Sequence, residues 1–173
     1  MTNSNQQSEH RKAVSLTVNG RDVARDVEPR LSLLDFVRDE LDLMGTHSGC
    51  EHGVCGVCTV LLDGEPVRAC LMFAVQCEGQ VVETIESEGP SHDELSVIQD
   101  AFWEKHGLQC GYCTSGMILT ARAFLKRHPN PNREEIREAI SSNLCRCTGY
   151  LQIIESIELA AERLAGSNIG QEN

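Results

Sequence analysis

Eight of the nine cysteines in this 173-residue chain fall into two sets of four whose spacing suits metal chemistry. Four, two and eleven residues separate successive members of the first set, and two, thirty-one and one separate those of the second. The first set is Cys50, Cys55, Cys58 and Cys70, and the second set is Cys110, Cys113, Cys145 and Cys147. Thiolates hold both iron-sulfur clusters and structural zinc, so each set has the ligands for one such centre.

The spacing of the first set matches a plant-type ferredoxin, in which three cysteines of one loop and a more distant fourth hold a 2Fe-2S cluster. Gly49 directly precedes the first of these three cysteines, and Gly53 and Gly56 lie between them. Glycine permits positive φ and close backbone approach, so this loop can fold tightly and turn its N–H groups toward the sulfurs. The first set therefore indicates a 2Fe-2S cluster, whereas the second spacing is less diagnostic alone.

Three other uses of the cysteines remain open at this point. Zinc suits any four cysteines, although a common zinc ribbon separates two CxxC pairs by about 15 to 20 residues. Disulfides are a second alternative, although nine cysteines cannot all pair and one thiol would remain free. A Rieske centre is suggested only by Cys50-Glu51-His52, and no cysteine is followed by histidine three places later.

The elements that position the first set are predicted to form a small α+β unit. Residues 14–18 and 23–27 are strand-like, and Asn19-Gly20 between them is typical of a type I′ hairpin turn. Apolar residues recur at helical steps from residue 31 to 41, which predicts a helix with Ser32 as a possible cap. The other predicted elements are strands at 59–62 and 66–69 around Asp63-Gly64, and a last strand at 81–85.

The elements that position the second set are predicted to be helices. After a polar linker near residue 86, the periodic segments are residues 95–106, 117–126, 132–144 and 151–164. The first helix is expected to end with Gly107 as its C′ residue, and the second to begin at a cap formed by Thr114 or Ser115 and to stop before Pro129. An Asn132/Glu135 capping box is expected to begin the third helix, and Gly166 to follow the end of the fourth. Four short helices suggest a bundle in which the two cysteine-bearing turns meet at one end.

This organisation divides the chain into two domains and two tails. Residues 1–12 are expected to be a disordered tail and residues 166–173 a flexible tail. The α+β domain spans residues 13–87 and the helical domain spans residues 88–165.

Composition argues against several classes of function. The formal charge is −11, with 15 basic and 26 acidic residues, which disfavours nucleic acid and anionic membranes as partners. Apolar runs are far shorter than the roughly 20 residues that span a bilayer, and the polar N-terminus lacks a secretory signal. We therefore expect a cytoplasmic protein. It has no phosphate-binding glycine loop and no recognisable nucleophile and base, so substrate chemistry is expected elsewhere.

Three ordered motifs contain the cysteines: GCEHGVCGVC at residues 49–58, QCGYCTSGM at residues 109–117 and NLCRCTGY at residues 143–150. Together they resemble the iron-sulfur subunit of the xanthine oxidase/aldehyde oxidase family of molybdenum hydroxylases. The resemblance spans residues 13–164, and all eight cysteine positions match. It implies a plant-ferredoxin-like β-grasp domain followed by a four-helix bundle, each with one 2Fe-2S cluster.

The same resemblance implies partners and a role in electron transfer. A large subunit would hold a molybdopterin cofactor and a medium subunit FAD, as a dimer of heterotrimers. This chain, with no catalytic residue of its own, would relay electrons between them. Gln109 and Cys147 would approach the pterin. A free-standing ferredoxin-like carrier and a structural zinc module remain the alternative functions.

Several other residues carry simpler expectations. Cys77 lies outside both sets and is expected to pack as a small buried hydrophobe. Tyr112 is a candidate shield for the second cluster, and Arg146 is either a positive charge near that cluster or a surface salt-bridge residue. The remaining expectations are loop or interface positions for His47 and His52, and core or partner contacts for Phe102 and Trp103.

Overall fold

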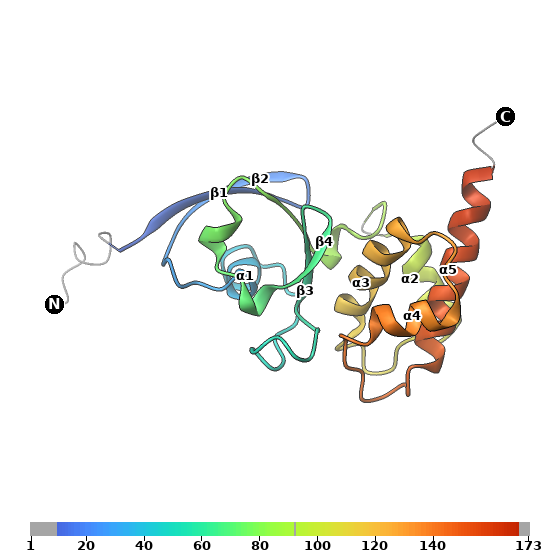
Figure 1. The fold of residues 1–173 in the computed structure, drawn as a ribbon. Coiled ribbons are helices and arrows are strands. Elements are labelled where there is room, and N and C mark those ends of the chain that lie inside the picture. Colours follow the sequence, from blue (N-terminus) through green and yellow to red (C-terminus); the bar gives the residue numbers. More distant parts are fainter. Residues whose placement is uncertain (1–9, 92, 170–173) are drawn as a thin grey trace.

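The computed structural model describes residues 10–91 and 93–169. In this part of the chain, five strands form one mixed sheet in the N-terminal half, and four helices gather in the C-terminal half (Figure 1). We call these parts the sheet body and the helical body. The architecture is of the α+β class expected from the sequence. The predicted tails at residues 1–9 and 170–173 lie outside the described residues.

The sheet has the strand order β2-β1-β5-β3-β4, with β1 and β5 parallel and the other neighbours antiparallel. Both predicted hairpins are confirmed. Asn19 and Gly20 in the first turn have φ of 50° and 74°, and Asp63 and Gly64 in the second have φ of 51° and 85°, as type I′ turns require. The strands are β1 (Lys12–Val18), β2 (Arg21–Val27), β3 (Thr59–Leu62), β4 (Glu65–Arg68) and β5 (Val81–Glu83).

One helical segment and three 3₁₀ turns complete the sheet body. Helix α1 (Leu33–Asp35) begins at Ser32, whose hydroxyl accepts from Asp35 N at 3.0 Å as predicted, and continues into a π-helical turn at Phe36–Glu40. Leu33 and Phe36 are fully buried in the core of the sheet. The 3₁₀ turns are η2 (Ala69–Leu71), η3 (Ala74–Cys77) and η4 (Ile85–Ser87), and η4 replaces the end of the strand predicted to reach residue 85.

The helical body consists of helices around a second apolar core. They are α2 (Val97–Glu104), α3 (Thr114–Arg127), α4 (Arg133–Ile140) and α5 (Leu151–Ile169). Ile136, Ile153 and Ile157 are fully buried in this core. Within the described ranges, none of the helices is both long enough and apolar enough to cross a membrane.

Local capping determines where α4 begins, whereas a long-range contact explains why a glycine, Gly107, follows α2. Asn132 Oδ1 accepts from the N–H groups of Glu134 and Glu135, and the Glu135 carboxylate accepts from Asn132 N, which confirms the capping box. His106, with φ of 56°, takes the left-handed position predicted for Gly107. A Cβ on Gly107 would lie 2.4 Å from Ser156 Oγ on α5, so this glycine permits close helix packing.

Three other helix ends differ from the prediction. Neither Thr114 nor Ser115 caps α3, which begins at Thr114 itself with Cys113 in the capping position. Helix α4 ends at Ile140 because the following residues turn toward the sheet body. Helix α5 passes through Gly166. Among the described residues, no atom lies within 4 Å of a Cβ added there, so the glycine only lowers the helix propensity of this segment.

The two bodies meet along helix α3 (Figure 1). Leu61 of β3 packs with Leu119 and Ala123 of α3 in a small separate apolar cluster. A Cβ on Gly116 of α3 would lie only 2.4 Å from the Gly56 carbonyl oxygen, which precedes β3. The cysteine-bearing segments of the two bodies are therefore held in direct contact by backbone packing.

Candidate iron-sulfur sites

The first set lies on one long loop and on the turn after the second hairpin. This first loop, residues 41–58, links the π-helical turn to β3 and carries Cys50, Cys55 and Cys58. Cys70 lies in η2, directly after β4. Pairing of β3 with β4 returns the chain to the loop, where Ala69 N donates to the Cys58 carbonyl oxygen at 3.2 Å. The hairpin thus places the fourth cysteine beside the other three.

Glycines keep the first loop narrow. A Cβ on Gly49 would lie 2.8 Å from Val57 Cγ2 and 3.0 Å from Cys55 Sγ. Gly53 has φ of 83°, and a Cβ there would lie 2.4 Å from Leu71 Cδ1. A side chain at Gly49 would crowd the Cys55 sulfur and one at Gly53 would clash with Leu71, so the loop is as tightly folded as its sequence predicts.

The thiols of the first set have contrasting environments. Cys55 N lies 3.4 Å from Cys50 Sγ, and this backbone N–H bond is the main reason that the pKa of Cys50 falls to about 6. Burial raises the pKa of Cys70 to about 11, and its contact with the Cys58 side chain adds to the rise. Backbone donors that favour a thiolate also suit an anionic cluster, so this donor set fits a 2Fe-2S group.

The second set comes from two turns far apart in the sequence. Cys110 and Cys113 lie between α2 and α3, and Cys145 and Cys147 lie between α4 and α5. Cys147 Sγ lies 3.5 Å from Cys110 Sγ, and the Cys113 side chain contacts that of Cys145. Each thiol in one turn therefore faces a thiol in the other. Among the described residues, no three His, Cys, Asp or Glu side chains surround a position for one metal ion.

Hydroxyl residues flank the cysteines of the second set in the sequence. Thr148 Oγ1 donates to Cys145 Sγ at 3.2 Å. The buried hydroxyls of Thr114 and Ser115, directly after Cys113, have no hydrogen-bond partner in the described part of the chain. Burial raises the pKa of Cys113 to about 12. A hydroxyl donor to Cys145 and unpartnered buried hydroxyls next in sequence to Cys113 suit a sulfur-rich anionic group, so the second set also fits a 2Fe-2S cluster.

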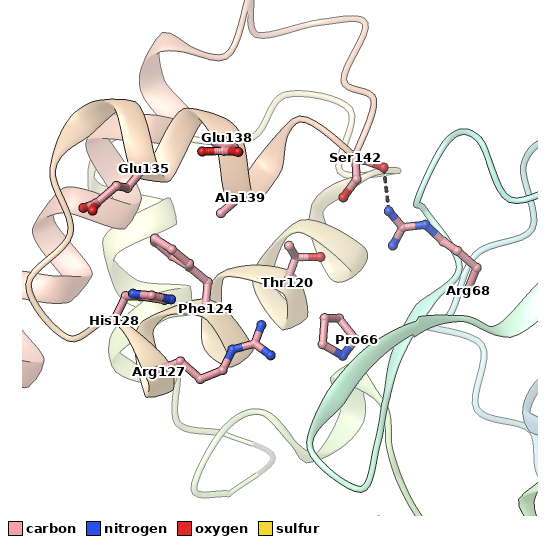
Figure 2. A pocket seen from close by; sticks show the side chains of 10 residues that line it. All are labelled: Pro66, Arg68, Thr120, Phe124, Arg127, His128, Glu135, Glu138, Ala139 and Ser142. Atoms are coloured by element: carbon pink, nitrogen blue, oxygen red, sulfur yellow. Dashed lines mark hydrogen bonds between the residues drawn. The ribbon is translucent and has the colours of Figure 1, made fainter.

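Direct hydrogen bonds join the two sites. Leu144 N, next to Cys145, donates to the Cys55 carbonyl oxygen at 2.8 Å. Asn143 Nδ2 donates to the Gly56 carbonyl oxygen at 3.1 Å. Figure 2 shows Arg68 reaching from β4 to the Ser142 carbonyl oxygen, where Nη2 donates at 2.6 Å. The residues between α4 and Cys145 are therefore bonded to the first loop.

The groove in Figure 2 lies on the same junction. Its volume is about 620 Å³, and Pro66 and Arg68 of β4 face Thr120 and Phe124 of α3 across it. No cysteine lines this groove. It is therefore separate from both candidate sites.

Other residues singled out in the sequence have varied positions. Cys77 is fully buried in the sheet core, as predicted. Phe102 is buried in the helical core, whereas Trp103 is 69% exposed and takes no part in it. Gln109 and Arg146 are exposed. The structure therefore leaves the expected pterin contact and the expected charge effect as predictions.

Sequence analysis missed the residues that bring the two sites together. Gly116 was not recognised as a contact point, although a glycine inside a helical pattern is a signal of close packing. Asn143, Arg68 and the pair formed by His47 and Tyr112 were also missed as links between the bodies. Asn143 and Gly116 do lie within the cysteine motifs, but nothing local indicates that they contact Gly56.

Two family models match the chain, one for each half. The model described as a 2Fe-2S iron-sulfur cluster binding domain matches residues 16–91. The model described as a 2Fe-2S binding domain matches residues 84–158. Each matched range contains one set of four cysteines.

Relatives of the chain cover nearly its whole length. Caffeine dehydrogenase subunit gamma from Pseudomonas sp. strain CBB1 is 53% identical over 84% of this chain and 88% of its own length. The nicotine 6-hydroxylase small subunit from Paenarthrobacter nicotinovorans is 44% identical over 91% of this chain and 94% of its own.

A solved structure has the same fold. A chain in the crystal structure of quinoline 2-oxidoreductase from Pseudomonas putida 86 matches with a TM-score of 0.87 and 47% identity, over 91% of this chain and 98% of that chain. This structural match, the two 2Fe-2S family models and the two relatives all point to the same family as the three cysteine motifs. The chain belongs to the iron-sulfur subunits of the xanthine oxidase family of molybdenum hydroxylases.

Proposed function

We propose that the chain binds two 2Fe-2S clusters, one on each set of four cysteines. Cys50, Cys55, Cys58 and Cys70 would hold the first, and Cys110, Cys113, Cys145 and Cys147 would hold the second; all eight are free thiols in the structure. When bound, each cluster supplies one-electron transfer. The chain's own contribution is to donate N–H and O–H hydrogen bonds toward the sulfurs and to fix the two sites relative to each other.

The two-domain organisation belongs to the same proposal. The sheet body would be a ferredoxin-like β-grasp domain over residues 13–87, and the helical body a four-helix bundle over residues 88–165. The support is that each body has its own apolar core, and that strands give way to helices after η4. Each domain would then carry one complete cysteine set.

In the assembled enzyme, the chain would relay electrons between a molybdopterin site on a large partner subunit and FAD on a medium partner subunit. The observation that carries this proposal is the 2.8 Å hydrogen bond from Leu144 N to the Cys55 carbonyl oxygen, because an electron relay needs its two centres close together. Relatives named as small or gamma subunits support the multi-subunit context. A dimer of heterotrimers in the cytoplasm completes the proposal.

The large subunit would bind the face that carries the exposed end of the second set. Cys110 and Cys147 are both exposed, with their sulfurs 3.5 Å apart, and Gln109 precedes Cys110 directly. This arrangement places Gln109 and Cys147 near one another at the surface. Their proposed role is to contact the pterin of the large subunit.

Metal analysis and copurification test this function. The full chain isolated from its native source should contain about four irons and matching acid-labile sulfide, with two distinct electron paramagnetic resonance (EPR) signals on reduction. A colourless protein with zinc would refute the cluster assignment. Copurification with a molybdenum-containing chain would support the relay, whereas a single 19 kDa iron-sulfur species would favour a free-standing ferredoxin-like carrier.

A further inference from the structure

One aromatic pair joins the first loop to the helical body beside both cysteine sets. His47 lies three residues before Cys50, and Tyr112 lies between Cys110 and Cys113. Their rings stack with centroids 4.6 Å apart and planes 7° from parallel. The two residues are 65 positions apart in the sequence, so the stack is a tertiary contact between the two bodies.

Two hydrogen bonds of opposite direction accompany the stack. His47 Nδ1 lies 2.8 Å from the Tyr112 carbonyl oxygen, and because a carbonyl only accepts, Nδ1 must carry the proton. The Tyr112 hydroxyl donates to the Ser48 carbonyl oxygen. Each side chain thus binds the backbone of the other segment, which fixes both the spacing and the rotation of the two segments.

The pair lies outside both apolar cores. Tyr112 is 48% exposed, and neither ring belongs to the core cluster of the sheet body or of the helical body. The stack is therefore not needed to bury the apolar surface of either body. Its location between the cysteine sets points to a role in their relative placement.

The first loop is bonded to both turns of the second set. The Cys145 turn is held through Leu144 N and the Cys55 carbonyl oxygen, 2.8 Å apart. The Cys110 turn is held through Tyr112 and His47. Other contacts of the first loop with the helical body are made at Cys55 and Gly56, so the His47–Tyr112 pair adds a hold at the opposite side of Cys50.

We propose that His47 and Tyr112 are positioning residues that set the spacing of the two iron-sulfur sites for electron transfer. This inference rests on the proposed function. Each transfer moves one electron from the reduced site to the oxidised site, and no bond is made or broken. Electron transfer between two centres slows as the distance between them grows, so a change in their spacing would change the rate.

The test is EPR spectroscopy of the full chain with its clusters, frozen after complete reduction. Two nearby paramagnetic centres split each other's signals, and the splitting falls with the cube of their distance. Tyr112→Ala and His47→Ala remove the stack, while Tyr112→Phe keeps the ring and loses the bond to Ser48. His128→Ala is the matched control because His128 stacks on Phe124 within the helical body, with centroids 5.2 Å apart.

We expect the unchanged protein and the control to have the same resolved splitting. Tyr112→Ala and His47→Ala should change the size of this splitting while keeping full iron and sulfide, and Tyr112→Phe should change it less. An unaltered splitting in both alanine variants, or unsplit signals in the unchanged protein, would overturn the positioning role and leave the cluster assignment standing. Loss of iron in all three variants would assign the pair to folding and also overturn it. An unchanged chain without iron would refute the proposed function itself.

Discussion

The two cysteine sites bring four thiols together in different ways. In the first site, three thiols come from a nine-residue stretch of the first loop that starts at Cys50 and ends at Cys58, and glycines shape that stretch locally. In the second site, thirty-one residues separate Cys113 from Cys145, and the two turns come together through the packing of the helices that they connect. The comparison implies that the first site depends on local backbone geometry and the second on the integrity of an apolar core.

The largest expected effect comes from breaking the helical core. Ile157 of α5 is fully buried, and replacing it with alanine should cost about 2–5 kcal/mol of unfolding free energy. Because the second site needs correctly packed helices, Ile157→Ala should lose about half of the iron and the EPR signal of one cluster. Iron analysis and reduced-state EPR on the purified full chain measure both.

A matched change in the sheet core sharpens this prediction. Leu33 of α1 is also fully buried, and Leu33→Ala should cost a similar amount of stability but affect the other cluster signal. Equal loss of both signals in both variants would contradict the comparison. It would mean that the two bodies fold as one cooperative unit.

A smaller effect is expected at the contact between the sites. Alanine normally favours a helix over glycine by about 1 kcal/mol, but a Cβ on Gly116 would lie 2.4 Å from the Gly56 carbonyl oxygen. Gly116→Ala should therefore destabilise the chain by about 1–3 kcal/mol, as overpacking does. Urea denaturation measures the loss. The perturbed cluster signal should be that of the first site, although the change is in α3.

Gly166→Ala is the control for this substitution. Gly166 also lies in a helix, and no atom in the described part of the chain lies within 4 Å of a Cβ added there. The same chemical change should there raise stability by up to about 1 kcal/mol. A gain of stability in both variants would show that the contact between Gly116 and the first loop is looser than the structure indicates.

Local features of the fold could be predicted from the sequence because their causes are local. Asn19-Gly20 and Asp63-Gly64 accept the φ values of their turns, and Ser32 and Asn132 cap the helices that follow them. The first cysteine loop belongs to the same class, since its spacing and glycines lie within one short segment. Such features need no knowledge of the rest of the molecule.

Features set by long-range contacts could not be predicted. Gly107 resembles a helix terminator, yet its role is to admit Ser156 from α5. Helix α4 ends before the predicted residue because Asn143 and Leu144 bond to the first loop. The stacking of His47 on Tyr112 has no local signal, since each residue taken alone is an ordinary loop residue. The candidate sites could be located from the sequence, but not their relative placement.

The smallest expected effect is a pH dependence at the junction between the bodies. The Glu88 side chain is only 3% exposed and accepts from Arg122 Nη1 at 3.2 Å and from Ser96 Oγ at 3.0 Å. Burial raises the pKa of Glu88 above its usual 4.5, although Arg122 and Ser96 act in the opposite direction. The folded chain therefore holds this proton more tightly than the unfolded chain does.

The sign of the effect follows from this difference in proton affinity. The contribution of Glu88 to stability is fully present below pH 4.5 and is lost as the pH rises through its raised pKa. Glu88→Gln removes this titrating group. The unfolding free energy of the unchanged chain minus that of the variant should therefore fall as the pH rises from 4.5 through the raised pKa of Glu88. Glu83→Gln removes the other carboxylate that binds Arg122 and separates loss of the ion pair from titration of Glu88. A difference that rises with pH would mean that the attraction of Arg122 outweighs burial, and that charge as well as backbone packing holds the two cysteine sites together.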